Sequence, residues 1–155
     1  MATISKDTPL HELTLRKYEK PYNIKDRDLV RKLCLSMGLL QPGDSRDVVV
    51  DVLYVLLNAR RQDKMLHSEE IKELVVEFRK QGGLTLNGIA SSNIRRQLKR
   101  LRDIFLIEKI KNNYRVTEFD AVSMIFEKKI EKFLLATIME RVKDYLKAVD
   151  DEFSK

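Results

Sequence analysis

The segment Ser92–Asp103 contains many side chains that donate hydrogen bonds to anions. With Ile94 at the centre of a buried helix face and about 100° per residue, the apolar side chains fall in one narrow arc. These are Ile94, Leu98, Leu101 and Phe105. We expect the opposite face to present Ser92, Asn93, Arg96, Lys99 and Arg100, with Arg95 and Arg102 on the flank. Such groups pair with phosphates and with purine edges in a major groove.

A second set of basic and amide side chains follows in the chain. The turn-forming residues Lys111-Asn112-Asn113 lie between the extended stretches Leu106–Ile110 and Tyr114–Val116, which predicts a β-hairpin. Its polar side chains are Lys109, Lys111, Asn112, Asn113 and Arg115. Lysine and asparagine at a hairpin tip suit contact with a phosphate backbone or a minor groove.

The positive charge is concentrated in these two segments. Residues 91–115 carry eight basic side chains against Asp103 and Glu108, a net charge of +6 that equals that of the whole chain. A basic excess is compatible with nucleic acid or with an anionic membrane as partner. The basic residues do not lie on an amphipathic helix with Trp or Phe opposite, so the sequence favours nucleic acid over membrane.

Catalytic and metal-binding patterns are not found in the sequence. His11 and His67 are isolated, there is no phosphate-binding loop, and the carboxylates are scattered over charged helix faces. We therefore expect no enzyme activity, no metal or other cofactor and no small-molecule ligand. Cys34, in an apolar run, is expected to be a buried, inert thiol.

Apolar periodicity predicts a mainly α-helical fold. Residues 1–24 form an arm without regular structure, and Met65-Leu66 is a short extended stretch. The predicted helices are Asp26–Met37, one capped by Ser45 that continues to Arg61, one from the cap Ser68 to Gly82, one capped by Ser91 or Ser92, and Glu118–Val149.

The order of elements over residues 44–117 resembles the winged helix-turn-helix superfamily, in particular its small prokaryotic or archaeal regulators. The closest likeness is the spacing from Leu101 to Leu106-Ile107, followed by Tyr114–Thr117. The resemblance implies three helices with a hairpin wing, and a recognition helix at Ser92–Asp103. The chain departs from the family in a loop of about ten residues before that helix, and in Phe105, where many members carry glycine.

The last predicted helix needs a partner. About 32 residues at 1.5 Å each span roughly 48 Å, whereas a core of ~75 residues has a radius of gyration near 11 Å. The helix must extend beyond its domain, and its apolar stripe must be covered. Its expected dimer-interface residues are Phe126, Ile130, Phe133, Ile138, Val142 and Tyr145. Helix Asp26–Met37 of the same chain is the alternative cover, and both arrangements are compatible.

These features predict three parts: an N-terminal arm and helix (1–43), a winged-helix domain (44–117) and a dimerisation helix (118–155). The expected function is that of a dimeric winged-helix protein that binds double-stranded DNA, as a transcriptional regulator or a nucleoid-associated factor. A two-fold dimer would present two recognition helices to a pseudo-palindromic site. The alternative is a winged-helix subunit that binds other proteins. The N-terminus has no apolar signal core, so we expect a cytoplasmic location at the nucleoid.

Overall fold

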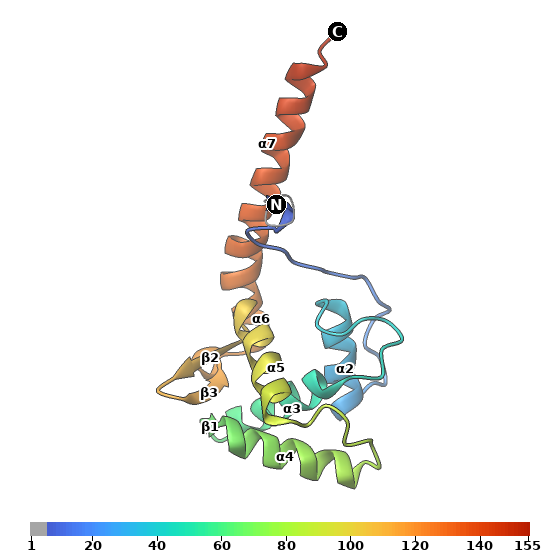
Figure 1. Ribbon diagram of the computed structural model, residues 1–155, viewed down its shortest axis with the longest axis vertical. Coiled ribbons are helices and arrows are strands. Elements are labelled where there is room, and N and C mark those ends of the chain that lie inside the picture. The colour runs from blue at the N-terminus through green and yellow to red at the C-terminus, as the bar shows by residue number, and fades with distance from the viewer. Residues whose placement is uncertain (1–5) are drawn as a thin grey trace.

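The computed structural model describes residues 6–155, which form a mainly helical fold with a small antiparallel sheet (Figure 1). The helices of the folded domain are α2 (Asp26–Ser36), α3 (Val48–Arg60), α4 (Ser68–Gln81) and α5 (Ser91–Asp103). The strands β1 (Leu66–His67), β2 (Ile107–Ile110) and β3 (Asn113–Val116) lie in the order β1-β3-β2. The C-terminal helical segments are α6 (Val122–Ile125), the π-helical η2 (Phe126–Leu135) and α7 (Ala136–Glu152).

Helix α3 is the centre of the core. Its sequence is apolar on most sides, and all side chains from Val48 to Leu56 except Tyr54 are buried, Leu53 and Leu56 completely. Helices α2, α4 and α5 and strand β3 all pack against it. An all-round apolar helix can only be stable in this central position, as its sequence predicted.

The predicted helix caps are wrong. Helix α3 begins at Val48 with Asp47 at the N-cap position, two residues after the expected cap Ser45. At α5 the N-cap is Ala90, and the Ser91 hydroxyl is hydrogen-bonded to side chains of α4 instead.

Helix α4 is capped by His67 rather than by Ser68. The His67 Nδ1 accepts a hydrogen bond from the Glu69 backbone N–H, while the Glu70 carboxylate accepts one from the His67 N–H. This reciprocal pair of hydrogen bonds is a capping box in which histidine takes the place of serine or threonine.

The predicted hairpin is confirmed. Ile107 pairs with Val116 and Ile110 with Asn113, and the two residues between the strands, Lys111 and Asn112, both have positive φ. That turn conformation matches the twist of an antiparallel pair. Strand β1 adds to the free edge of β3 through Leu66 and Tyr114.

The C-terminal helix starts later than predicted. Glu118 and Phe119 adopt positive φ in a 3-10 turn (η1, Thr117–Phe119), so the helix begins at Val122 rather than Glu118. The segment η2, which follows α6 directly, is wound as a π-helix. Ile130 and Leu134 are buried there, whereas no side chain of α7 is buried and α7 extends away from the domain (Figure 1).

Helix α2 covers α3 and not α7. Its buried residues Val30, Cys34 and Leu35 belong to the same core cluster as the side chains of α3. Burial raises the pKa of the Cys34 thiol to about 12, which makes the thiol unreactive near neutral pH. The boundary predicted at residue 43 therefore divides two segments that share one core.

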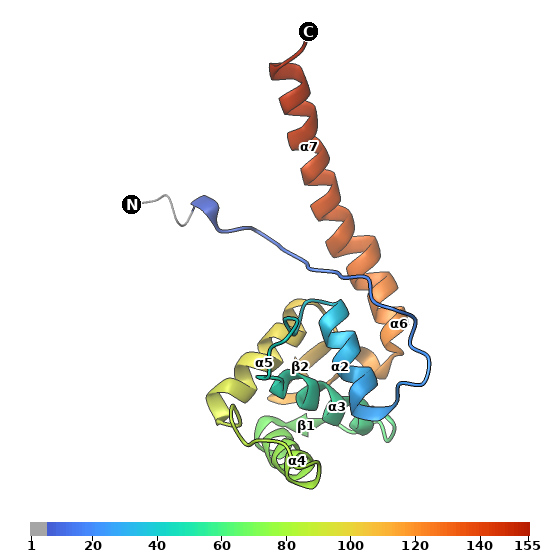
Figure 2. The same ribbon diagram turned by 90° about the vertical axis from the view of Figure 1, so that its right-hand side faces the viewer.

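The predicted arm is confirmed for residues 8–24, and residues 1–5 of it lie outside the described chain. In chain order it first passes the lower end of the C-terminal helix and then runs beside α2 (Figure 2). Arg16 fixes it, because its guanidinium donates to the carbonyl of Leu35 at 2.8 Å and to the side chain of Gln41 at 2.7 Å.

Candidate nucleic-acid interface

The exposed face of α5 is a strip of polar and basic side chains. Ile94, Leu98 and Leu101 are buried against α3 and α4, as their spacing predicted. The opposite side leaves six side chains exposed: Asp103 and the five that we call the basic strip, which are Ser92, Arg95, Arg96, Lys99 and Arg102. Within the described chain Lys99 is paired with Asp103 at 3.0 Å, and the guanidinium groups of the strip make no ion pair.

Asn93 and Arg100, expected on the exposed face, are half-buried on one flank. The Asn93 amide donates to the carbonyl of Gly88 at 2.7 Å, and the Arg100 guanidinium donates to that of Leu39 at 2.7 Å. Their predicted outward orientation is wrong, because the loop after α2 and the loop before α5 cover this flank. The spacing of the apolar residues in α5 locates the centre of its buried face. It does not show which of the two flanks beside that face is covered by another segment of the chain.

The opposite flank is open. Arg95 and Arg102 lie there and are exposed, so they replace Asn93 and Arg100 as accessible donors. Arg102 is the residue that sequence reasoning left out of the candidate site. A signal for it existed, since Arg102 lies about 80° from Ile94, the centre of the buried face, at a position of the wheel that is compatible with exposure as well as with burial.

The hairpin contributes fewer free cations than expected. Lys109, Lys111 and Asn112 are exposed, as predicted. Arg115 is half-buried, because its guanidinium binds the Glu108 carboxylate at 2.7 Å and lies 4.8 Å from the centre of the Phe119 ring. It stabilises the base of the hairpin and is not free to bind a ligand in this conformation.

A hollow joins the helix to the hairpin. It has a volume of about 510 Å³ and opens between the C-terminal half of α5 and strand β2. Three cations line it, Lys99 and Arg102 from the helix and Lys109 from the strand, against Asp103 and Glu108. Since Asp103 is paired with Lys99 and Glu108 with Arg115, the uncompensated charge of the hollow belongs to Arg102 and Lys109.

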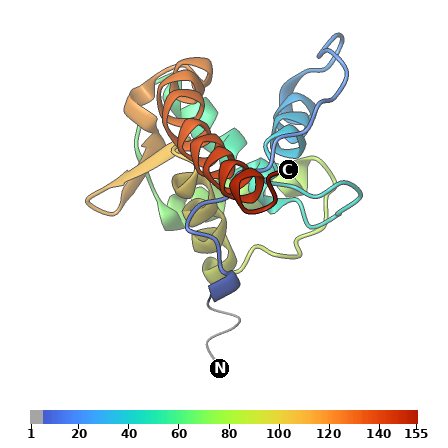
Figure 3. The ribbon, with the colours of Figure 1, turned by 90° about the horizontal axis from the view of Figure 1, so that it is seen from above.

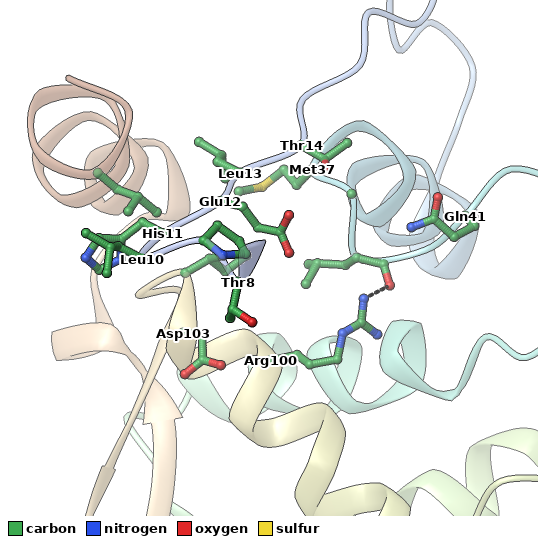
Figure 4. A pocket seen from close by; sticks show the side chains of 15 residues that line it. Thr8, Leu10, His11, Glu12, Leu13, Thr14, Met37, Gln41, Arg100 and Asp103 are labelled. Atoms are coloured by element: carbon green, nitrogen blue, oxygen red, sulfur yellow. Dashed lines mark hydrogen bonds between the residues drawn. The ribbon is translucent and has the colours of Figure 1, made fainter. Parts of the chain in front are cut away.

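A larger hollow lies under the N-terminal arm. It measures about 820 Å³ and separates residues 8–14 of the arm from the loop after α2 and the end of α5. Figure 4 shows Arg100 at its floor, with its hydrogen bond to the Leu39 carbonyl, and Asp103 at its edge. The side chains around it are mixed in type. Among the described residues no three His, Cys, Asp or Glu side chains are grouped to hold a metal ion.

The expected dimer residues separate into two groups. Ile130 is completely buried in the chain's own core and Phe126 is half-buried against it, so both are corrected from partner-facing to core positions. Both lie in the first part of the C-terminal helix, which packs against the core cluster before α7 leaves the domain. Phe133, Val142 and Tyr145 are exposed, and Ile138 is half-exposed.

Comparison of the chain with protein-family models, with curated proteins and with solved structures finds no match in any of the three. No described helix is both long enough and apolar enough to cross a membrane.

Proposed function

We propose that the chain is a winged-helix protein that binds double-stranded DNA. The observation that carries the proposal is the hollow lined by Lys99, Arg102 and Lys109, which makes the basic strip of α5 continuous with the hairpin. A helix and an adjacent hairpin that present cations to one space can contact both the groove and the flanking phosphates of one duplex.

Three details of the fold support the winged-helix assignment. The elements from α3 to β3 follow the order helix, strand, helix, helix, hairpin. The short strand β1 pairs with β3 of the hairpin. Phe105, at the corner between α5 and β2, has a φ of 66°, the left-handed conformation that glycine adopts without strain. Many family members carry glycine at this corner.

In the proposed complex α5 lies in the major groove. Arg95 and Arg96 face the base edges and the nearer phosphates, while Lys109, Lys111 and Asn112 of the hairpin contact the backbone beside the groove. Each phosphate neutralised by a cation releases a counterion, so affinity must fall linearly on a double-logarithmic plot against salt. We assign the protein a role as a transcriptional regulator or nucleoid-associated factor, acting as a homodimer through α7.

The second candidate is a protein-interaction subunit. It is favoured by the apolar stripe of α7, which no described part of the chain covers. A stoichiometric protein partner together with no DNA affinity at moderate salt would decide for it. The basic strip is the feature it leaves unexplained.

The test replaces Arg95 and Arg96 together with alanine. Both side chains are exposed and unpaired within the described residues, so thermal stability should change little. An arginine that contacts a base edge contributes ~1–3 kcal/mol, and the salt slope falls by about one for each phosphate that is no longer neutralised. We expect DNA affinity to fall at least tenfold, measured by fluorescence anisotropy over a salt series.

The matched control replaces Lys17 and Lys20 with alanine. These lysines are also exposed and remove the same charge, but they lie in the arm beside α2. Figure 3 shows α2 and the hairpin on opposite sides of the α7 axis. Equal reductions of affinity in both double variants would contradict the assignment of the basic strip, since only the net charge would then matter.

A further inference from the structure

Helix α7 carries a continuous apolar seam on a surface with no cover in the described chain. Figures 1 and 2 show it projecting well clear of the folded domain. Apolar residues recur at alternating intervals of four and three, and all but the first, which is half-buried, are exposed. They are Leu135, the last residue of η2, then Met139, Val142, Leu146 and Val149 of α7, and Phe153, which directly follows α7.

This spacing is a heptad repeat, the pattern by which one helix packs against another. Met139, Leu146 and Phe153 occupy the a positions, and Leu135, Val142 and Val149 the d positions. Ile138 and Tyr145 widen the seam on one side. The other side carries charges: Lys143 and, seven residues later, Asp150, both at e positions.

These two charges are free in the chain. Exposed ion pairs join Arg141 to Asp144 and Lys147 to Asp151, all on the outer side of the helix. Within residues 6–155 no ion pair or hydrogen bond is formed by the Lys143 or Asp150 side chain, although both border the seam. Opposite charges at such positions set the orientation of paired helices.

A parallel pair of α7 helices would leave the charges of Lys143 and Asp150 without partners. In that arrangement the e position faces the partner's g position, so Lys143 would lie opposite Ile138 of the second copy and Asp150 opposite Tyr145. The acidic run Asp150-Asp151-Glu152 would also lie beside the same run of the second copy. Like charges at close range repel, and the two helix dipoles would be aligned side by side.

An antiparallel pair removes each of these conflicts. With Leu146 opposite Val149 of the second copy, and Val142 opposite Phe153, the e positions face one another and Lys143 lies beside Asp150 of the second copy. The acidic run then lies opposite residues 143–145 of the second copy and away from the second acidic run, and the dipoles oppose. We propose that α7 pairs antiparallel with α7 of a second copy.

The occupant is a second copy because the seam is complementary to itself. A two-fold axis between Lys147 and Ala148 pairs Val142 with Phe153 in both directions and repeats the contact of Lys143 with Asp150. The overlap takes in the seam from Val142 to Phe153, and Leu135 and Met139 lie before it. This reciprocity is the requirement for an isologous interface. The inference rests on the self-association in the proposed function and does not depend on DNA binding.

The first test measures mass by sedimentation, then orientation by cysteine cross-linking under mild oxidation. The variant Val142→Cys/Phe153→Cys is expected to form a disulfide-linked dimer, and Val142→Cys alone is not. Neither position is buried, so both variants should retain the circular dichroism of the parent. The native Cys34 is fully buried and does not interfere.

A monomer at tens of micromolar would overturn self-association, and efficient cross-linking of Val142→Cys alone would overturn the antiparallel orientation. Charge reversal provides an independent readout. Lys143→Asp and Asp150→Lys should each weaken dimerisation at least severalfold, and the double reversal should restore it. Failure of the double reversal to restore the dimer would also contradict the antiparallel contact. The sedimentation, cross-linking and charge-reversal results are all independent of whether the basic strip binds DNA.

Discussion

At the residue scale, a buried ion network holds the helices together. Asp51 on α3 is fully buried and accepts from Arg79 of α4 at 2.6 Å and from Arg27 of α2 at 2.8 Å. Asp47 joins the same two guanidinium groups at 3.0 Å each. Burial opposes the ionisation of Asp47, yet the hydrogen bonds from Arg27 and Arg79 hold the pKa of its carboxyl below the ordinary value.

We predict that Asp51→Asn destabilises the fold by about 3–5 kcal/mol. The amide keeps the size of the side chain but leaves the Arg79 guanidinium, only 2 % exposed, short of compensating charge. Asp44→Asn is the matched control, because it breaks the exposed pair with Arg46 at 3.1 Å and should have little effect. Chemical denaturation measures both, and equal effects would show that the buried network has no special role.

The sequence predicted where the cations of the candidate site lie along the chain, but not which of them are bound to other groups of the protein. The cluster of cations at residues 91–115 is visible in composition alone. Whether a cation is free depends on contacts distant in the chain: Arg100 is 61 residues from Leu39, whose carbonyl it binds. The pairing of Arg115 with Glu108 could be predicted from the sequence, because the register of the hairpin places the two residues opposite each other.

At the element scale, the corner between α5 and β2 combines strain with packing. Phe105 has a left-handed backbone, and its ring meets that of Phe133 edge-on at 6.0 Å between centroids. The hairpin corner is thereby joined to η2. A non-glycine residue in this conformation costs roughly 1–2 kcal/mol, which the ring packing must offset.

Two substitutions separate the strain from the packing. Phe105→Ala and Phe105→Gly both remove the ring, but only glycine relieves the left-handed backbone. We predict that the glycine variant is more stable than the alanine variant by about 1 kcal/mol, although neither can pack a ring against Phe133. The measurement is the free energy of unfolding in urea. An alanine variant as stable as the glycine variant would argue against a strained corner.

Element prediction failed where winding or caps depended on neighbours. The helices and the hairpin follow from apolar period and turn residues, and their bounds agree within a few residues. The π-helical winding of η2 has no such signal, because Phe126, Ile130 and Phe133 fit one face of an α-helix equally well. In the structure Ile130 and Leu134 of this segment are buried, a packing that the local sequence does not specify.

At the scale of the whole molecule, α7 would determine how the proposed dimer presents its two basic strips. The proposed antiparallel seam centres near Lys147, about 25 residues from the helix start at Val122 on either side. At 1.5 Å per residue the two helix starts lie on the order of 75 Å apart. Adjacent half-sites of a straight duplex are separated by only ~34 Å. The proposed dimer is therefore too long for the compact pseudo-palindromic site that the sequence predicted. We expect it to contact two separate DNA segments instead.

We predict that the dimer bridges two duplexes. Beads that carry one duplex should capture a second, fluorescent duplex when the protein is added, because each end of the rod holds one basic strip. Leu146→Glu places a charge in the centre of the seam and should abolish capture, while each monomer still binds a single duplex with little change in intrinsic affinity. Arg95→Ala/Arg96→Ala should lower binding and capture together. Capture by Leu146→Glu at the level of the parent would refute bridging through α7, whereas an absence of all DNA binding in the parent would refute the basic strip instead.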